Sequence, residues 1–166
     1  MGAPTRLEGD LYVNGNLSSK TATPAASSIT NASIIAAAGI DATKVDHQHR
    51  LVFHQPNTTA TAETRVIYHC YGATGSVIAI YAGSIAIAVG AATVTVDLKK
   101  NGSSILTGVI TLNSSNTARV AVAGTLTGST SLVAGDVLEV VTTATAGGGT
   151  IPTGLFVAIT VNEKAQ

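Results

Sequence analysis

Hydrophobic and polar residues alternate along most of the chain beyond its first third, which is the pattern of strands with one buried face. The clearest case is the stretch 93–112, TVTVDLKKNGSSILTGVITL, in which Val94, Val96 and Leu98 share one face. The pair Asn101-Gly102 follows, and both residues tolerate the positive φ of a type I′ turn. This stretch is therefore predicted to be a long β-hairpin with one buried and one polar face.

Short apolar runs of the same kind continue almost to the C-terminal end, and turn-forming residues separate them. The predicted strands are 51–55, 65–71, 77–81, 85–89, 93–98, 105–112, 119–126, 137–144 and 155–161. About nine short strands with no helix between them predict an all-β fold, an antiparallel β-sandwich. A jelly roll is the preferred winding. An immunoglobulin-like winding stays open, because periodicity does not determine the order of the strands.

The stretch 77–89 alternates Ile with Ala almost throughout. On a strand, one face would carry Ile and Val and the other Ala and Ser. The face of small residues suits the core, where it would lie opposite bulky side chains. It would also suit a flat contact with a neighbouring subunit, and of the two readings the core is favoured.

The first 46 residues differ from the rest and are predicted to form an extended N-terminal arm, with 47–166 as the β-sandwich head. A short strand or hairpin is expected near 7–17, a proline-broken linker at 18–28, and at most one short helix at 29–40. So apolar an arm requires a partner to cover it. The residues expected to make these contacts are Leu7, Leu11, Val13, Ile29, Ile34, Ile35, Ile40 and Val45.

Composition narrows the classes of function. The chain has 166 residues, of which 45% are hydrophobic and only 11% charged, and its formal net charge is zero. A nucleic-acid partner is not expected, because binding to phosphates requires clustered Lys and Arg. A membrane partner is not expected either, since no apolar run is long enough to span a bilayer and no signal peptide is recognisable. So few charges suggest that much of the surface is covered by other copies or by a partner.

Candidate chemistry is sparse. His47 and His49 would lie on one side of a strand, and three such pairs around a trimer axis could bind an octahedral metal ion. The favoured interpretation makes them polar residues at a hinge, so no metal or other cofactor is expected. Cys70 lies in an apolar run and is interpreted as an inert strand cysteine. Only Glu8 and Asp10 form a close acidic pair, so the chain is not expected to be an enzyme.

Four stretches carry a resemblance to a known group of proteins. LEGDLYVNGNLSS resembles strand units of bacteriophage fibre and structural proteins, and ITNASIIAAAGIDATKVDHQH resembles a linker of phage fibre-like proteins. VDLKKNGSSIL and SLVAGDVLEVV resemble the jelly-roll heads of phage capsid decoration (cement) proteins and head fibres. The order of arm, linker and β-head is more specific than any single stretch.

The resemblance implies a virion structural protein that is made in the host cytoplasm and lies on the outer capsid surface. It also implies a homotrimer whose arm binds the major capsid protein, as a decoration protein or short head fibre. The alternative is a receptor-binding tail fibre or fibre-tip adhesin, whose partner would be a host surface receptor. The absence of Trp from the sequence counts mildly against sugar recognition in that second role.

Overall fold

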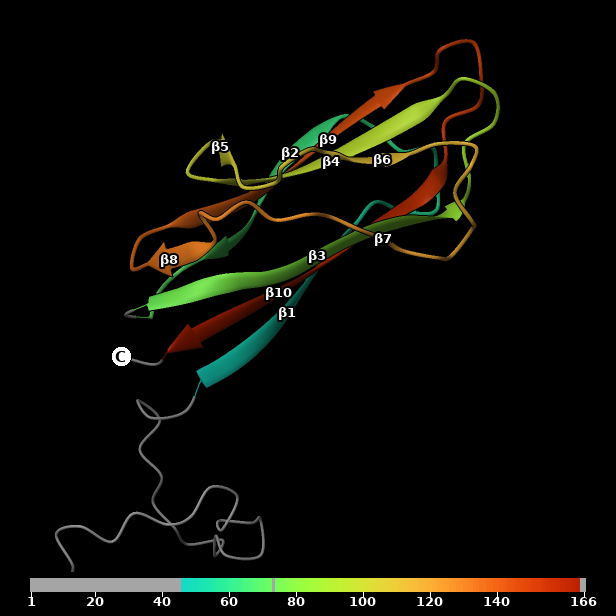
Figure 1. The fold of residues 1–166 in the computed structure, drawn as a ribbon. Coiled ribbons are helices and arrows are strands. Elements are labelled where there is room, and N and C mark those ends of the chain that lie inside the picture. Colours follow the sequence, from blue (N-terminus) through green and yellow to red (C-terminus); the bar gives the residue numbers. More distant parts are fainter. Residues whose placement is uncertain (1–45, 73, 165–166) are drawn as a thin grey trace, which may run out of the picture. The chain divides into compact units, whose positions relative to one another are not determined.

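Ten strands and no helix form the part of the chain that the computed structural model describes, residues 46–72 and 74–164 (Figure 1). Two sheets face each other. Sheet A contains β1 (Asp46–His54), β3 (Thr74–Ala86), β7 (Val122–Ala123), β8 (Ser131–Val133) and β10 (Thr153–Lys164). Sheet B contains β2 (Glu63–His69), β4 (Thr93–Lys100), β5 (Ser103–Ser104), β6 (Ile110–Leu112) and β9 (Val137–Thr145).

The strand order is that of a jelly roll. Sheet A runs β1-β10-β3-β7 with β8 also paired to β3, and sheet B runs β2-β9-β4-β5 with β6 also paired to β4. The antiparallel pairs are nested: β1 with β10, β2 with β9, β3 with β7 and β8, and β4 with β5 and β6. A long hairpin rolled into two sheets has this order. The predicted antiparallel β-sandwich is therefore confirmed, and of its two possible windings it adopts the jelly roll.

The predicted Asn-Gly turn is the tip of that rolled hairpin. Asn101 and Gly102 both have positive φ, 49° and 82°, as a type I′ turn requires. The side chain of Asn101 donates to Asp136 Oδ1 at 2.7 Å and accepts from the backbone N–H of Val137 at 2.8 Å. These bonds tie the tip to the start of β9.

The core lies between the sheets and consists of small and branched aliphatic side chains. Val94, Val96 and Leu98 of β4 are fully buried, as the alternation predicts. The other large, fully buried side chains come from both sheets and, at Ile105, from the stretch between β5 and β6. They are Ile80, Ile105, Leu112, Leu132, Leu138, Val140, Leu155, Val157 and Ile159.

One long strand, β3, replaces the two strands that were predicted at 77–81 and 85–89. A bulge at Ile78 shifts the alternation, because Val77 pairs with Val161 while Ala79 pairs with Thr160. Val77, Ile80, Ala82 and Ser84 are buried, and the outward side chains include Ala79 and Tyr81. The expected division into an Ile face and an Ala face is therefore wrong, since alanines lie on both faces.

The predicted strands 105–112 and 119–126 are mostly irregular. They reduce to β6 and β7, and β8 was not predicted. The chain crosses here from sheet B to sheet A. Its backbone hydrogen bonds are isolated: the Thr107 N–H donates to the Thr125 carbonyl, and the Thr127 N–H donates to the Ile105 carbonyl. A crossing segment cannot keep the regular pairing of one sheet.

The segment DHQH was expected to precede the body as a hinge, but it lies within β1, where His47 pairs with Glu163 of β10. Residues 1–45 lie outside the described residues. The strand, linker, helix and arm contacts that were predicted there therefore stay predictions. The boundary between arm and head stays a prediction. Among the described residues no helix is long and apolar enough to span a membrane.

Candidate interaction surfaces

The outer face of sheet A carries an apolar strip. Its central cross-strand row runs from Val52 on β1 through Ala158 on β10 and Tyr81 on β3 to Ala123 on β7. In the next row Phe156 lies beside Gly83. The sheet A strip, as we name it, consists of Val52, Tyr81, Ile85, Ala123, Phe156 and Ala158. Three of its large side chains are exposed in the single chain, Val52 at 67%, Tyr81 at 44% and Ile85 at 36%.

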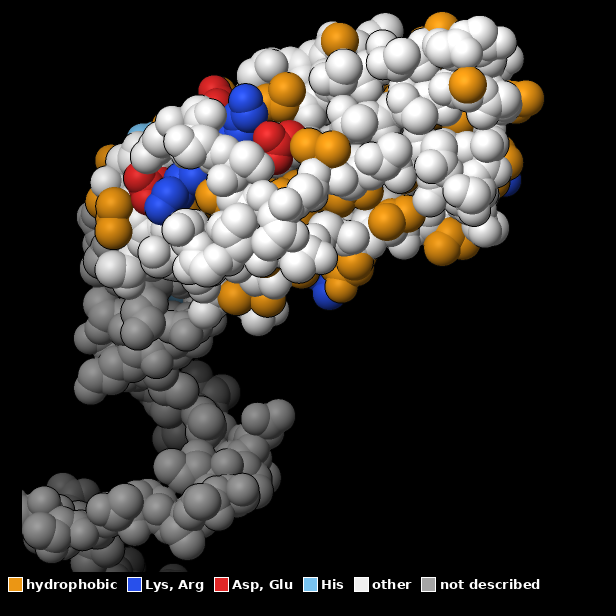
Figure 2. Space-filling model, turned by 45° about the horizontal axis from the view of Figure 1, so that its top comes forward, with side chains coloured by type: hydrophobic (Ala, Val, Ile, Leu, Met, Phe, Trp, Pro, Cys, Tyr) orange, Lys and Arg blue, Asp and Glu red, His pale blue; other side chains and the backbone are white. Residues whose placement is uncertain are grey.

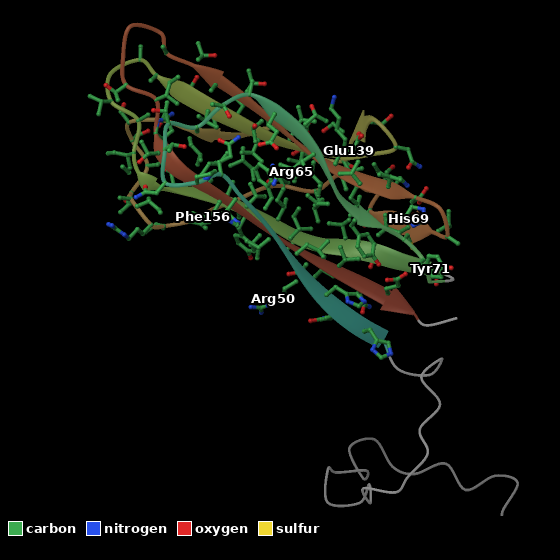
Figure 3. All side chains as sticks on the ribbon, turned by 180° about the vertical axis from the view of Figure 1, so that it is seen from behind. Arg50, Arg65, His69, Tyr71, Glu139 and Phe156 are labelled. Carbon is green, nitrogen blue, oxygen red and sulfur yellow. The ribbon has the colours of Figure 1, made fainter. Side chains whose placement is uncertain are left out.

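The sheet A strip carries little charge. On the other side of the central row, Arg50 pairs with Thr160, which pairs with Ala79. Arg50 is the one formally charged side chain in these three described rows. A shallow hollow of about 270 Å³ lies at this place, lined by Arg50, Val52, Tyr81, Ala158, Ile159 and Thr160. In Figure 3 Arg50 and Phe156 lie on one side of the sandwich and Glu139 on the opposite side.

The outer face of sheet B is polar instead. One of its cross-strand rows consists of Thr111, Thr95 and Thr143. Another contains Lys99 and Glu139, whose opposite charges lie on adjacent strands. In Figure 2, which brings this side forward, red and blue side chains gather at one end and most of the remaining surface is white. The two faces of one sandwich thus differ sharply in polarity.

The exposed hydrophobic side chains follow the same division. Ten large ones are exposed in the described residues, and only Val66 belongs to a strand of sheet B. Those that belong to strands of sheet A are Val52, Ile78, Tyr81, Ile85 and Val133. A large apolar patch on one face of a small domain is typical of an interaction surface.

A second feature is the open side of the sandwich, where the edge strands β1 and β2 lie next to each other without pairing. A cleft of about 390 Å³ lies here and is lined only by residues of these two strands. The guanidinium of Arg65 lies 5.1 Å from the centre of the Phe53 ring and 2.5 Å from Glu63 Oε1. Arg65 therefore covers the core at this side (Figure 3).

A polar cluster closes the sandwich at the end of β10. The carboxylate of Glu163, 13% exposed, accepts hydrogen bonds from the Tyr68 hydroxyl and the Gly72 N–H, and the Cys70 thiol lies 3.6 Å away. His49 Nε2 lies 3.6 Å from Glu163 Oε2. Since Glu163 belongs to sheet A and Tyr68 to sheet B, this cluster links the two sheets.

The electrostatics of this cluster suit a structural role. Burial, followed by the effect of Glu163, raises the pKa of both the Tyr68 hydroxyl and the Cys70 thiol. Burial by itself would raise the pKa of Glu163, but the hydrogen bonds from Tyr68, Gly72 and Cys70 outweigh it and leave that pKa lowered. Cys70 is fully buried and stays protonated at neutral pH, whereas a nucleophilic cysteine needs an accessible thiolate.

The structure brings His47 and His49 to one face of β1, beside Glu163. No group of three His, Cys, Asp or Glu side chains in the described residues could hold a metal ion. The metal site that would need three chains remains a prediction that a single chain cannot test. The eight arm residues expected to bind partners lie in 1–45, outside the described part.

Sequence reasoning missed the sheet A strip. Its residues come from four strands that are far apart in the chain, and only the register places Val52 beside Ala158 and Tyr81. One signal was present in the sequence, the run of small and apolar residues along 77–89 that suggested a flat contact.

Comparisons with known proteins add little. No family model matches the chain, and no curated protein matches it significantly. Among solved structures it is similar to one described as Desmodium yellow mottle tymovirus, with 10% sequence identity, 99% of this chain and 96% of that chain covered, and a TM-score of 0.29. So weak a likeness carries no argument, and the function must be argued from the sequence and the surfaces of the head.

Proposed function

We propose that this chain is a non-enzymatic virion structural protein of a bacteriophage. In this role it is a trimeric capsid decoration protein or short head fibre, which binds the major capsid protein on the outer surface of the assembled shell. The proposal rests chiefly on one observation, the contrast between the apolar outer face of sheet A and the polar outer face of sheet B. A surface of this kind serves contact with other protein chains.

The fold supports the proposal by analogy. Double-sheet jelly rolls recur in viral capsid proteins, although they also occur in lectins and enzymes. Fold alone therefore does not assign a function. The resemblance of the arm and linker to phage fibre-like proteins selects the virion among these possibilities.

The buried chemistry of the head also supports a structural role. The carboxylate of Glu163 accepts hydrogen bonds from Tyr68, Gly72 and Cys70. Asp136 is held in the same way by Asn101 and the Val133 N–H. Carboxylates whose oxygens are filled by the protein's own donors hold the fold together.

The arm would provide attachment. Its apolar residues, from Leu7 to Val45, would be covered by the capsid or by neighbouring arms, while the head projects outward. Binding to the assembled lattice but not to free coat protein would stabilise the shell by mass action.

Copy number per virion, measured by quantitative mass spectrometry against the major capsid protein, tests the proposal. A number that approaches that of the capsid protein is expected for a decoration protein, and a handful to a few dozen copies, in multiples of three, for a head fibre. Copies confined to the tail would favour the receptor-binding fibre instead. Absence from purified virions would reject a virion role.

A truncation tests the role of the arm. Removal of residues 1–45 stops short of β1, which begins at Asp46. The truncated chain should keep the β-rich circular dichroism spectrum of the full chain and lose binding to capsids stripped of the protein. Retained binding would assign attachment to the head.

A further inference from the structure

We infer that the sheet A strip is the surface through which the heads of this chain pack against one another, so that its occupant is a second copy of the same chain. The inference rests on the proposed function, which it deepens by naming the surface that joins the subunits. Three copies would turn the outer faces of sheet A toward a common axis. The outer faces of sheet B would then face solvent.

The polarity of the two faces supports this orientation. The sheet A strip exposes Val52 and Tyr81, whereas the corresponding rows of sheet B present Thr95, Thr143 and the Lys99–Glu139 pair. Burial of the apolar face removes its side chains from water at little cost in lost hydration of polar groups. Burial of the face of sheet B would require the charges to be desolvated.

The charge of the strip favours a copy of the same chain over a strongly charged partner. In the three described rows, Arg50 is the single formal charge and stands at the β1 margin. A strongly charged partner of either sign would find at most the one charge of Arg50 there. A second copy presents the same neutral, apolar surface, and repetition of one contact around a closed axis is how most homo-oligomers assemble.

The connection to the arm is consistent with this arrangement. β1 begins at Asp46, directly after the 45 residues of the N-terminal segment, and β1 is the edge strand of sheet A. Heads that pack through sheet A would have their first strands near the common axis. Their arms would then start close together, as a trimeric attachment to the capsid requires.

The outer face of sheet A offers room for such a contact. β10 has 12 residues, so the face is about 40 Å long, and its three long strands, β1, β10 and β3, make it about 14 Å wide. This flat area of about 560 Å² is most of the roughly 800 Å² per partner of a standard protein interface, and the short strands β7 and β8 widen it locally. Contact with the β1 margin of the neighbour would add to it.

Thiol labelling of the full-length chain tests the inference. Val52→Cys places a thiol in the strip and Thr143→Cys places one on the outer face of sheet B, while the native Cys70 is fully buried and serves as a silent background. Both variants are treated with a maleimide under non-denaturing conditions, and the mass of the assembly is measured by native mass spectrometry. We expect labelling at Val52→Cys to be at least about tenfold slower than at Thr143→Cys, because reaction needs an accessible thiolate.

A second substitution checks that another copy provides the protection. Addition of Tyr81→Arg to Val52→Cys should speed labelling toward the rate of Thr143→Cys, because it places like charges in the contact. Addition of Thr143→Arg to Val52→Cys is the matched control and should leave the rate unchanged.

Three results would overturn the inference. The first is equal labelling rates at Val52→Cys and Thr143→Cys. The second is slow labelling of Val52→Cys in a chain that has the mass of a monomer, and the third is slow labelling of Val52→Cys that the added Tyr81→Arg does not change. The second would mean that the strip is covered by the chain's own arm. Equal labelling of a protein that still attaches to capsids would reject this interface and leave the virion role standing. Slow labelling at Val52→Cys in an oligomer that is absent from purified virions would support the interface and reject the virion role.

Discussion

The ring of Phe156 covers Gly83 on the outer face of sheet A, where the two residues are register partners on β10 and β3. A Cβ added at Gly83 would lie 2.5 Å from Cζ of Phe156 and 3.0 Å from the carbonyl oxygen of Val120. The space above Gly83 is therefore filled by the aromatic ring, an arrangement known to stabilise glycine in sheets. This contact explains how β3 continues through a residue that usually ends a strand.

Substitution of Gly83 by Ala should lower the free energy of unfolding by about 1–3 kcal/mol, the usual cost of overpacking. The ring can move aside, but the Val120 carbonyl belongs to the backbone and has less freedom. In the double variant Gly83→Ala with Phe156→Ala, the loss should be smaller than the sum of the two single losses. Denaturant unfolding followed by circular dichroism measures all three.

Gly128→Ala is the matched control, since a Cβ at that position meets nothing within 4 Å. It should change the free energy of unfolding by less than about 0.5 kcal/mol. Additive losses at Gly83 and Phe156 would contradict the contact between them.

The alternation of residues was sufficient to predict the sandwich and its central hairpin. Period-2 burial depends on local geometry, so Val94, Val96 and Leu98 identified the inner face of β4 correctly. The Asn101-Gly102 turn was equally accessible, because positive φ at both positions restricts the residue types. Turn-forming residues also placed β9 and β10 nearly at their observed positions.

The remaining features depend on contacts between distant parts of the chain. Gly83 looks like a strand end unless Phe156 is known to cover it, and the bulge at Ile78 exists only in relation to β10. The sheet A strip likewise requires the register of four strands. The cluster around Glu163 joins residues that are more than 90 positions apart, such as Tyr68.

Asn101 stabilises the hairpin tip in two ways that substitution can separate. Asn101→Gly keeps the positive φ but loses the bonds to Asp136 and Val137, which should cost about 1–2 kcal/mol. Asn101→Ala loses the bonds as well and must also hold a left-handed conformation, so it should cost about 1 kcal/mol more. Equal unfolding free energies of the two variants in urea would show that the backbone conformation contributes nothing.

The carboxylate of Glu163 should make the head sensitive to acid. Burial alone would raise its pKa, but hydrogen bonds from Tyr68, Gly72 and Cys70 lower it below the ordinary value. A lowered folded-state pKa stabilises the fold fully above the unfolded pKa of about 4.3, and this contribution is lost as the pH falls through the folded value. Glu163→Gln should therefore be less stable than the parent at pH 7, and its stability should change less between about pH 5 and pH 2.

Urea unfolding at a series of pH values measures this dependence. Glu139→Gln is the control, because Glu139 lies on the outer face of sheet B between Val66 and Lys99. We expect Glu139→Gln to retain the acid sensitivity of the parent chain. If the stability of Glu163→Gln depends on pH as that of the parent does, other carboxylates cause the acid sensitivity. Asp136 is then the first candidate, because hydrogen bonds from the Val133 N–H and Asn101 lower its pKa.

Arg65 closes the open side of the sandwich through its contact with Phe53 rather than through its ion pair with Glu63. The side chains of that pair are 54% and 27% exposed, and exposed pairs contribute about 0–1 kcal/mol. The guanidinium over the Phe53 ring shields the core between the edge strands β1 and β2, which do not pair with each other, and a contact of this kind contributes about 0.5–2 kcal/mol. Arg65→Ala should thus lower the free energy of unfolding more than Glu63→Gln does, and Arg65→Met, which keeps an aliphatic cover, should fall between them. Equal losses for Arg65→Ala and Glu63→Gln would instead make the ion pair the main interaction at this side of the head.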